Sequence, residues 1–74
     1  MTEVTDELKR LASIAADLGL SAELRTKSIE LMGKIGTSEA FHGLLELAGN
    51  EGLINRERDL ALKQAREILK QSRQ

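Results

Sequence analysis

A helix–glycine–helix stretch over residues 24–48 constrains the fold of this 74-residue chain more than any other feature. Small and apolar side chains recur there every three or four positions, as on the buried side of a helix: Leu24, Ser28, Leu31, Met32 and Ile35. Gly36 is then predicted to adopt the left-handed conformation that ends a helix, and Thr37 to cap the next helix by accepting from its first-turn amides. Because almost no loop separates the two helices, they must fold back on each other as a pair.

Gly33 lies inside the first of these two helices, one turn before the stop. A glycine in a helix interior is less favourable than alanine by about 1 kcal/mol. We therefore expect a packing reason for it, namely a neighbouring backbone that comes close to this position.

The N-terminal segment of the chain predicts a further helix, from about residue 2 or 5 to residue 18. Its apolar side chains recur at alternating steps of four and three: Val4, Leu8, Leu11, Ala15 and Leu18. Gly19 is expected to end this helix, and Ser21 to cap the next one, which runs to Ile35. The third helix is predicted over residues 37–48.

Residues 49–52, Gly-Asn-Glu-Gly, form the most loop-like cluster of the sequence. A fourth helix is predicted to begin between residues 53 and 55, with Asn55 as a candidate cap, and to run to about residue 70. Its buried stripe, widened by Leu62, is expected to be Ile54, Ala61, Ala65, Ile68 and Leu69. Leu53 and Leu60 fall outside this stripe, on another side of the same helix.

The length allows one domain, residues 1–74, near the lower size limit for a core without disulfides or metal. The chain has no Cys, so neither a disulfide framework nor a thiolate zinc site is expected. It has no Pro, Trp or Tyr, and it is rich in residues that favour helices. No run approaches about 18 apolar residues, and the N-terminus is acidic where a signal peptide would be basic. The sequence therefore predicts a cytoplasmic protein that does not span a membrane.

The two halves of the sequence are similar when one is shifted onto the other, and we call the shift that places Leu8 on Phe41 the repeat offset. The pairs that coincide at this offset are Leu8 with Phe41, Leu11 with Leu44, Ala15 with Ala48, Gly19 with Gly52, Leu20 with Leu53, Arg25 with Arg58, Ile29 with Leu62 and Ile35 with Ile68. The match is imperfect, since Leu24 falls on Glu57. An offset of this size is typical of helical repeats and predicts one repeat over about 2–36 and another over about 37–72. An ordinary four-helix bundle is the alternative, because its buried stripes would also coincide at some offset.

A resemblance to a known family is carried by the run Leu24-Arg25-x-x-Ser28-x-x-x-Met32-Gly33-x-Ile35-Gly36, followed by Ala40-Phe41-x-x-Leu44-Leu45-x-Leu47. The run resembles the second helix of one HEAT-type repeat continuing into the first helix of the next. This chain departs from the family pattern at Ser28, where alanine is usual, at Met32, where leucine is usual, and at His42, where proline is frequent. The resemblance covers about a third of the chain. It implies an all-α fold of four helices, arranged as two HEAT-like antiparallel pairs in a short solenoid of the armadillo type that serves as a scaffold.

The residues that come nearest to a chemical site are Glu39, His42 and Glu46, which share one face of the third predicted helix. No second His or Cys completes a metal site, and no nucleophile stands beside the histidine. We therefore expect no catalytic, metal-binding or cofactor-binding residue and no enzyme. A catalytic protein built on these three residues is a remaining hypothesis, and it predicts a metal in the purified protein.

The net charge of −1 divides unevenly, with −4 over residues 1–54 and +3 over residues 55–74. The excess positive charge is due to Arg56, Lys63, Arg66, Lys70 and Arg73. This stripe is typical either of a solvated helix face or of a surface that meets an acidic partner. A nucleic-acid-associated protein that uses Lys63, Arg66, Lys70 and Arg73 is the alternative function. The overall acidity, the lack of aromatic residues for stacking and the interspersed Glu57, Asp59 and Glu67 argue against it.

The last two helices carry more leucines than one small core can bury, which indicates a contact surface for another chain or for a second copy. The residues predicted to make this contact are Leu53, Leu60 and Gln64, with Arg56 and Lys63 as a charged rim. The sequence thus predicts a non-catalytic protein–protein interaction module that binds another polypeptide or itself. A bundle with a few isolated exposed leucines would need no such function.

Overall fold

Four helices make up most of residues 2–72, the part of the chain that the computed structural model describes, with side-chain surroundings for residues 6–71. Their bounds are α1 Thr2–Ala16, α2 Ala22–Ile35, α3 Ser38–Ala48 and α4 Asn55–Ser72. The predicted all-α fold of four helices is confirmed. The side chain of Val4 and the whole of Arg73 lie outside the described residues.

The ends of α2 and the start of α3 follow from local side-chain chemistry, as predicted. The hydroxyl groups of Ser21 and Thr37 each accept a hydrogen bond from the amide three residues on, at 3.2 and 3.1 Å. Gly36 has a φ of 68°, and its N–H donates to the carbonyl of Met32 at 3.4 Å. Two residues therefore suffice to separate α2 from α3.

Helix α1 ends at Ala16, earlier than the glycine that was expected to end it. Asp17 forms the turn instead: its carboxylate accepts from the amide of Gly19 at 2.9 Å, and its carbonyl from the amide of Leu20 at 3.1 Å. Leu18, predicted in the buried stripe, lies beyond the helix and is 60% exposed.

The turn after α3 repeats these hydrogen bonds at the repeat offset. Asn50 takes the place of Asp17: its side-chain oxygen accepts from the amide of Gly52 at 2.9 Å, and its carbonyl from the amide of Leu53 at 3.1 Å. The two turns are therefore locally equivalent, as the sequence comparison of the two halves predicts.

This second turn also corrects the predicted start of α4. Leu53 belongs to the turn and not to the helix, so its expected position on an exposed helix side is wrong; it is buried, with 3% of its surface exposed. Ile54, predicted in the buried stripe, is 54% exposed for the same reason. Asn55 is the first residue of α4 and not the residue before it.

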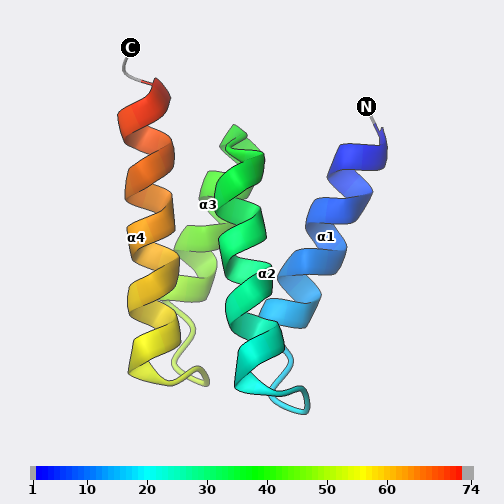
Figure 1. The fold of residues 1–74 in the computed structure, drawn as a ribbon, viewed down its shortest axis with the longest axis vertical. Coiled ribbons are helices and arrows are strands. Elements are labelled where there is room, and N and C mark those ends of the chain that lie inside the picture. Colours follow the sequence, from blue (N-terminus) through cyan, green and yellow to red (C-terminus); the bar gives the residue numbers. More distant parts are fainter. Residues whose placement is uncertain (1, 73–74) are drawn as a thin grey trace.

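The helices pack as two hairpins, the first formed by α1 and α2 and the second by α3 and α4 (Figure 1). In this view α2 and α4 lie side by side, α3 lies behind them, and α1 lies on the side of α2 away from α4. Helix α2 contacts all three other helices, and α3 contacts α1 as well. Within the described residues, α1 and α4 do not touch.

The core lies where the hairpins meet and draws on every helix and on the turn before α4. Its buried hydrophobic residues are Leu8, Ala15, Ile29, Met32, Ala40, Leu44, Leu47, Leu53, Ala61, Ala65 and Ile68. The buried residues of α2 are Arg25, Ser28, Ile29 and Met32. Two residues of the predicted stripe, Leu24 and Leu31, are instead exposed, so α2 is rotated relative to the prediction.

A buried ion pair explains this rotation. The Nε and Nη2 atoms of Arg25 donate to the two carboxylate oxygens of Glu57 on α4, at 3.1 and 2.8 Å. The third nitrogen, Nη1, donates to the carbonyl of Leu20 at 2.5 Å and to that of Asp17 at 3.5 Å. The hydrogen bonds to Glu57 raise the pKa of the Arg25 guanidinium, against the opposing effect of burial. Such a bidentate pair fixes both side chains in one geometry and joins the first hairpin to α4.

Gly33 has the packing reason that was expected, although the close neighbour is a side chain. The side chain of Gln64 on α4 lies directly over Gly33, where a β-carbon would collide with it. The glycine thus lets α2 and α4 approach each other.

Candidate functional site

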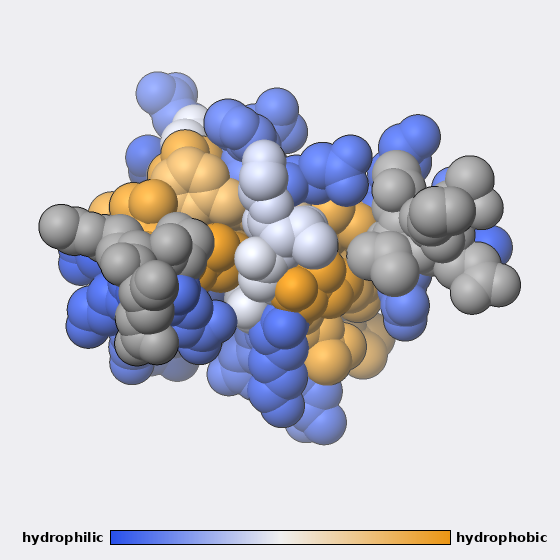
Figure 2. Space-filling view, turned by 90° about the horizontal axis from the view of Figure 1, so that it is seen from above, coloured by the Kyte–Doolittle hydropathy of each residue, from blue (hydrophilic) through white to orange (hydrophobic). Residues whose placement is uncertain are grey.

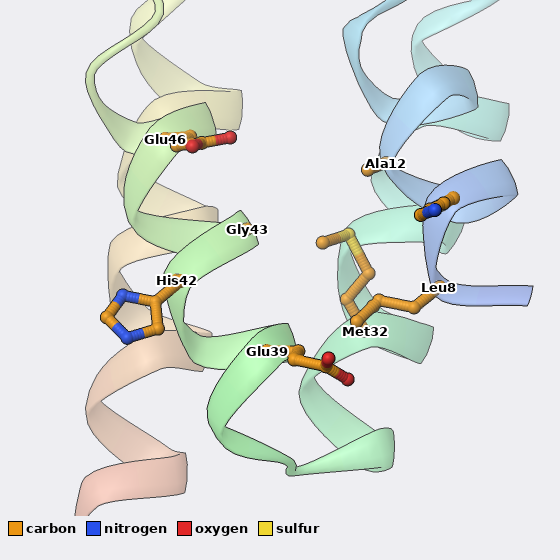
Figure 3. Close-up of a pocket in the computed structure, with 8 residues that line it drawn as sticks. Leu8, Ala12, Met32, Glu39, His42, Gly43 and Glu46 are labelled. Carbon is orange, nitrogen blue, oxygen red and sulfur yellow. The ribbon is translucent and has the colours of Figure 1, made fainter. Parts of the chain in front are cut away.

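An open groove of about 310 Å³ lies between α1 and α3, with α2 beneath it (Figure 3). It is lined by Leu8, Lys9 and Ala12 of α1, Met32 of α2, and Glu39, His42, Gly43 and Glu46 of α3. We call this the α1–α3 groove.

The floor of the α1–α3 groove is apolar. Met32 is fully buried and Leu8 is 7% exposed, and Figure 3 shows the Met32 side chain extending from α2 toward α3. A β-carbon at Gly43 would lie 2.9 Å from the terminal methyl of Met32. The missing side chain at Gly43 therefore lets Met32 reach α3 and keeps the groove open above it.

The rim of the groove is charged. On α3, the side chains of Glu39 and Glu46 point toward α1, whereas the His42 ring turns away from the groove (Figure 3). The His42 ring meets the ring of Phe41 edge-on, with centroids 5.7 Å apart. Lys9 lines the α1 side. The three residues considered as a chemical site thus do not converge, and no group of three or more potential metal ligands occurs within the described residues.

The five residues predicted to contact a partner do not form one surface. Leu53 is in the core, and Leu60 is half-buried against it. Gln64 covers Gly33. Arg56 lines a separate hollow between α2 and α4, and Lys63 is exposed. Of the five residues, Arg56 and Lys63 are exposed, Leu60 and Gln64 are partly buried, and Leu53 is buried in the core.

The sequence did not predict the α1–α3 groove. Its clearest signal is a small residue in a helix interior, Gly43, set between two acidic residues, Glu39 and Glu46. A groove at these residues depends on the distance between α3 and α1. The repeat offset in the sequence does not specify this distance.

Exposed apolar side chains are also found away from the groove. On α4, Leu62 is 36% exposed, and Leu69, seven residues on, faces the same side of the helix. Figure 2, seen from above, shows hydrophobic surface in two areas, one on the α4 side and one toward α1, with hydrophilic side chains around them.

Comparisons with protein-family models, with curated proteins and with solved structures give no match to this chain. Across residues 2–72, none of the helices combines the length and the apolar character that crossing a bilayer requires.

Proposed function

We propose that this chain is a non-catalytic protein-interaction module built from two HEAT-like helix pairs, and that it binds another polypeptide in the α1–α3 groove. The two equivalent turns, whose hydrogen bonds recur at the repeat offset, support the helix pairs. The contacts also fit two stacked hairpins, since α2 packs against α4 and α1 against α3. A closed up-and-down bundle would bring its first and last helices together, whereas the described parts of α1 and α4 do not touch.

The observation that carries the proposal is the groove itself. Its floor is made by Leu8, Ala12 and Met32 from two helices, and its charged side chains stand at the rim. Apolar grooves with polar rims between helices are typical places for an amphipathic segment of a partner to bind. Met32 suits such a site because the unbranched methionine side chain adapts to different apolar groups.

Gly43→Leu tests the proposal by filling the groove from α3. The β-carbon of the new side chain meets the flexible end of Met32. We therefore expect the fold to persist, which circular dichroism will check. Peptides selected from a displayed random library against the wild-type protein should bind the variant at least about tenfold more weakly, which is 1.4 kcal/mol. Lys27→Leu, which adds the same side chain at an exposed position outside the groove, is the control and should bind as the wild type does.

Three outcomes would count against the proposal. If no peptide is selected by the folded protein, the interaction function is wrong. Equal affinities for wild type and Gly43→Leu would place the binding surface elsewhere. Binding that is lost equally in Lys27→Leu would show that the loss in Gly43→Leu is not specific to the groove.

A second copy of this chain is one of the polypeptides that the proposal includes. The exposed Leu62 on α4 and Leu45 on α3 favour self-association. Light scattering between about 5 and 500 µM will show whether the particle mass rises with concentration, because weak dimers form in this range. If the particle mass stays that of one chain, self-association is excluded in this range. The proposed partner of the groove is then a different polypeptide.

Nucleic-acid binding is the second candidate function, and one contact favours it. Glu57 is buried against Arg25, so it does not offset the exposed positive charges of Arg56, Lys63 and Arg66 on α4. Retention on heparin or DNA that falls steeply with salt would support this function. Absence of retention at low salt would exclude it.

A further inference from the structure

The charges at the rim of the α1–α3 groove specify the partner more closely, in an inference that rests on the proposed function. Glu39 and Glu46 are seven residues apart on α3, which is two helical turns or about 10 Å along the axis. Both carboxylates point toward α1 (Figure 3). Gly43 lies between them in sequence and opens onto Met32, so the apolar floor is bracketed by two negative charges.

Among the residues whose side chains the structure describes, these two charges have no ion-pair partner. Both glutamates are exposed, and neither takes part in a salt bridge or side-chain hydrogen bond within the described residues. Lys9, on the opposite wall, is exposed as well. The groove therefore presents two negative charges on its α3 side and a positive charge on its α1 side.

We propose that the groove binds an amphipathic helix of a partner protein whose basic residues, seven positions apart, bracket a large apolar residue. The apolar residue enters the groove above Met32 and Gly43, while the two basic residues pair with Glu39 and Glu46. Because the spacing on a helix is the same for both partners, two basic residues seven apart reach both carboxylates at once. An acidic residue on the other edge of the partner helix faces Lys9, which fixes the direction in which the helix lies.

The experiment uses three synthetic helical peptides of about 18 residues, long enough to be partly helical in water. The first carries Lys at positions i and i+7 with Leu at i+3 and i+4. The second has the same composition with both Lys moved to the opposite face, and the third has Glu in place of both Lys. Affinities for the full chain are measured by fluorescence anisotropy at low and at high salt.

The first peptide is expected to bind most tightly, and Glu39→Gln with Glu46→Gln should weaken it by roughly 3- to 30-fold, as for two exposed ion pairs. The effect should shrink at high salt. The charge reversal Glu39→Lys with Glu46→Lys should transfer the preference to the peptide that carries Glu. A merely structural role of the glutamates would not produce this transfer. Glu51→Gln, at an exposed position in the turn after α3, is the control and should leave all three affinities unchanged.

The outcomes separate this inference from the function on which it rests. If peptides bind and Gly43→Leu weakens them, but the placement of Lys and the charge reversal have no effect, the partner chemistry is wrong and the interaction function stands. If none of the three peptides, nor any library peptide, binds the folded chain, both are wrong. If the first peptide binds and Gly43→Leu does not weaken it, the binding surface lies outside the α1–α3 groove, and this outcome would also overturn the inference.

Discussion

Ile29 on α2 and Leu62 on α4 occupy the same position of the two hairpins at the repeat offset, but differ in their surroundings. Ile29 has none of its surface exposed, whereas Leu62 is 36% exposed. Replacing the enclosed Ile29 by Ala leaves a cavity and should lower the free energy of unfolding by about 3 to 4 kcal/mol. Leu62→Ala leaves no enclosed cavity. The substitution removes three carbon groups of a side chain that is about two thirds buried, so the loss of hydrophobic transfer free energy should be about 1.5 kcal/mol.

The difference of about 2 kcal/mol corresponds to roughly 8 to 16 °C in Tm for a domain of this size. Thermal and urea unfolding of both variants, followed by circular dichroism at low and high protein concentration, measures it. If both variants lost the same stability at every protein concentration, the interpretation would be refuted. The packing of the hairpins would then not cover Ile29 more than Leu62. A loss for Leu62→Ala that grows with concentration would show that another copy covers α4.

Three further substitutions test the contacts that hold the hairpins together. Gly33→Ala should lower Tm despite the better helix propensity of alanine, because the new methyl group collides with Gln64; adding Gln64→Ala removes the colliding amide and should recover part of the loss, since the β-carbon of residue 64 stays 3.1 Å away. Gly36→Ala should cost about 1 kcal/mol in urea unfolding, since its φ of 68° is unfavourable for alanine; an unchanged midpoint would contradict the αL assignment. Arg25→Met should lower Tm more than the double variant Arg25→Met with Glu57→Leu, because the single change leaves a buried carboxylate without its partner; a double variant as unstable as the single one would refute this reasoning.

Much of the helical architecture could be predicted because it depends on short-range chemistry. Ser21, Gly36 and Thr37 fix helix ends through contacts with residues at most four positions away, and such contacts are visible in a sequence. The end of α1 was missed because Asp17 forms its turn before Gly19 is reached. A side chain that bonds to the backbone two residues on competes directly with the helix.

The rotation of α2 could not be predicted from hydrophobic periodicity. A pattern analysis favours burial of Leu24 over its neighbour Arg25, yet Arg25 is buried because Glu57 meets it from α4. The pairing of Leu24 with Glu57 at the repeat offset looks like an imperfection of the repeat, although Glu57 is the residue that neutralises the arginine. The groove was missed for a related reason, because it depends on the spacing between α1 and α3 and not on the pattern of either helix.

The guanidinium of Arg25 contacts the turn that closes the first hairpin and the carboxylate that the second hairpin supplies. Separating the hairpins would expose both charges to water and would also open the apolar core that the two hairpins share. We therefore expect that neither half folds alone, however similar their sequences are. The chain should fold in a single cooperative transition, and a fragment cut between the halves should stay largely unfolded until its complement is added.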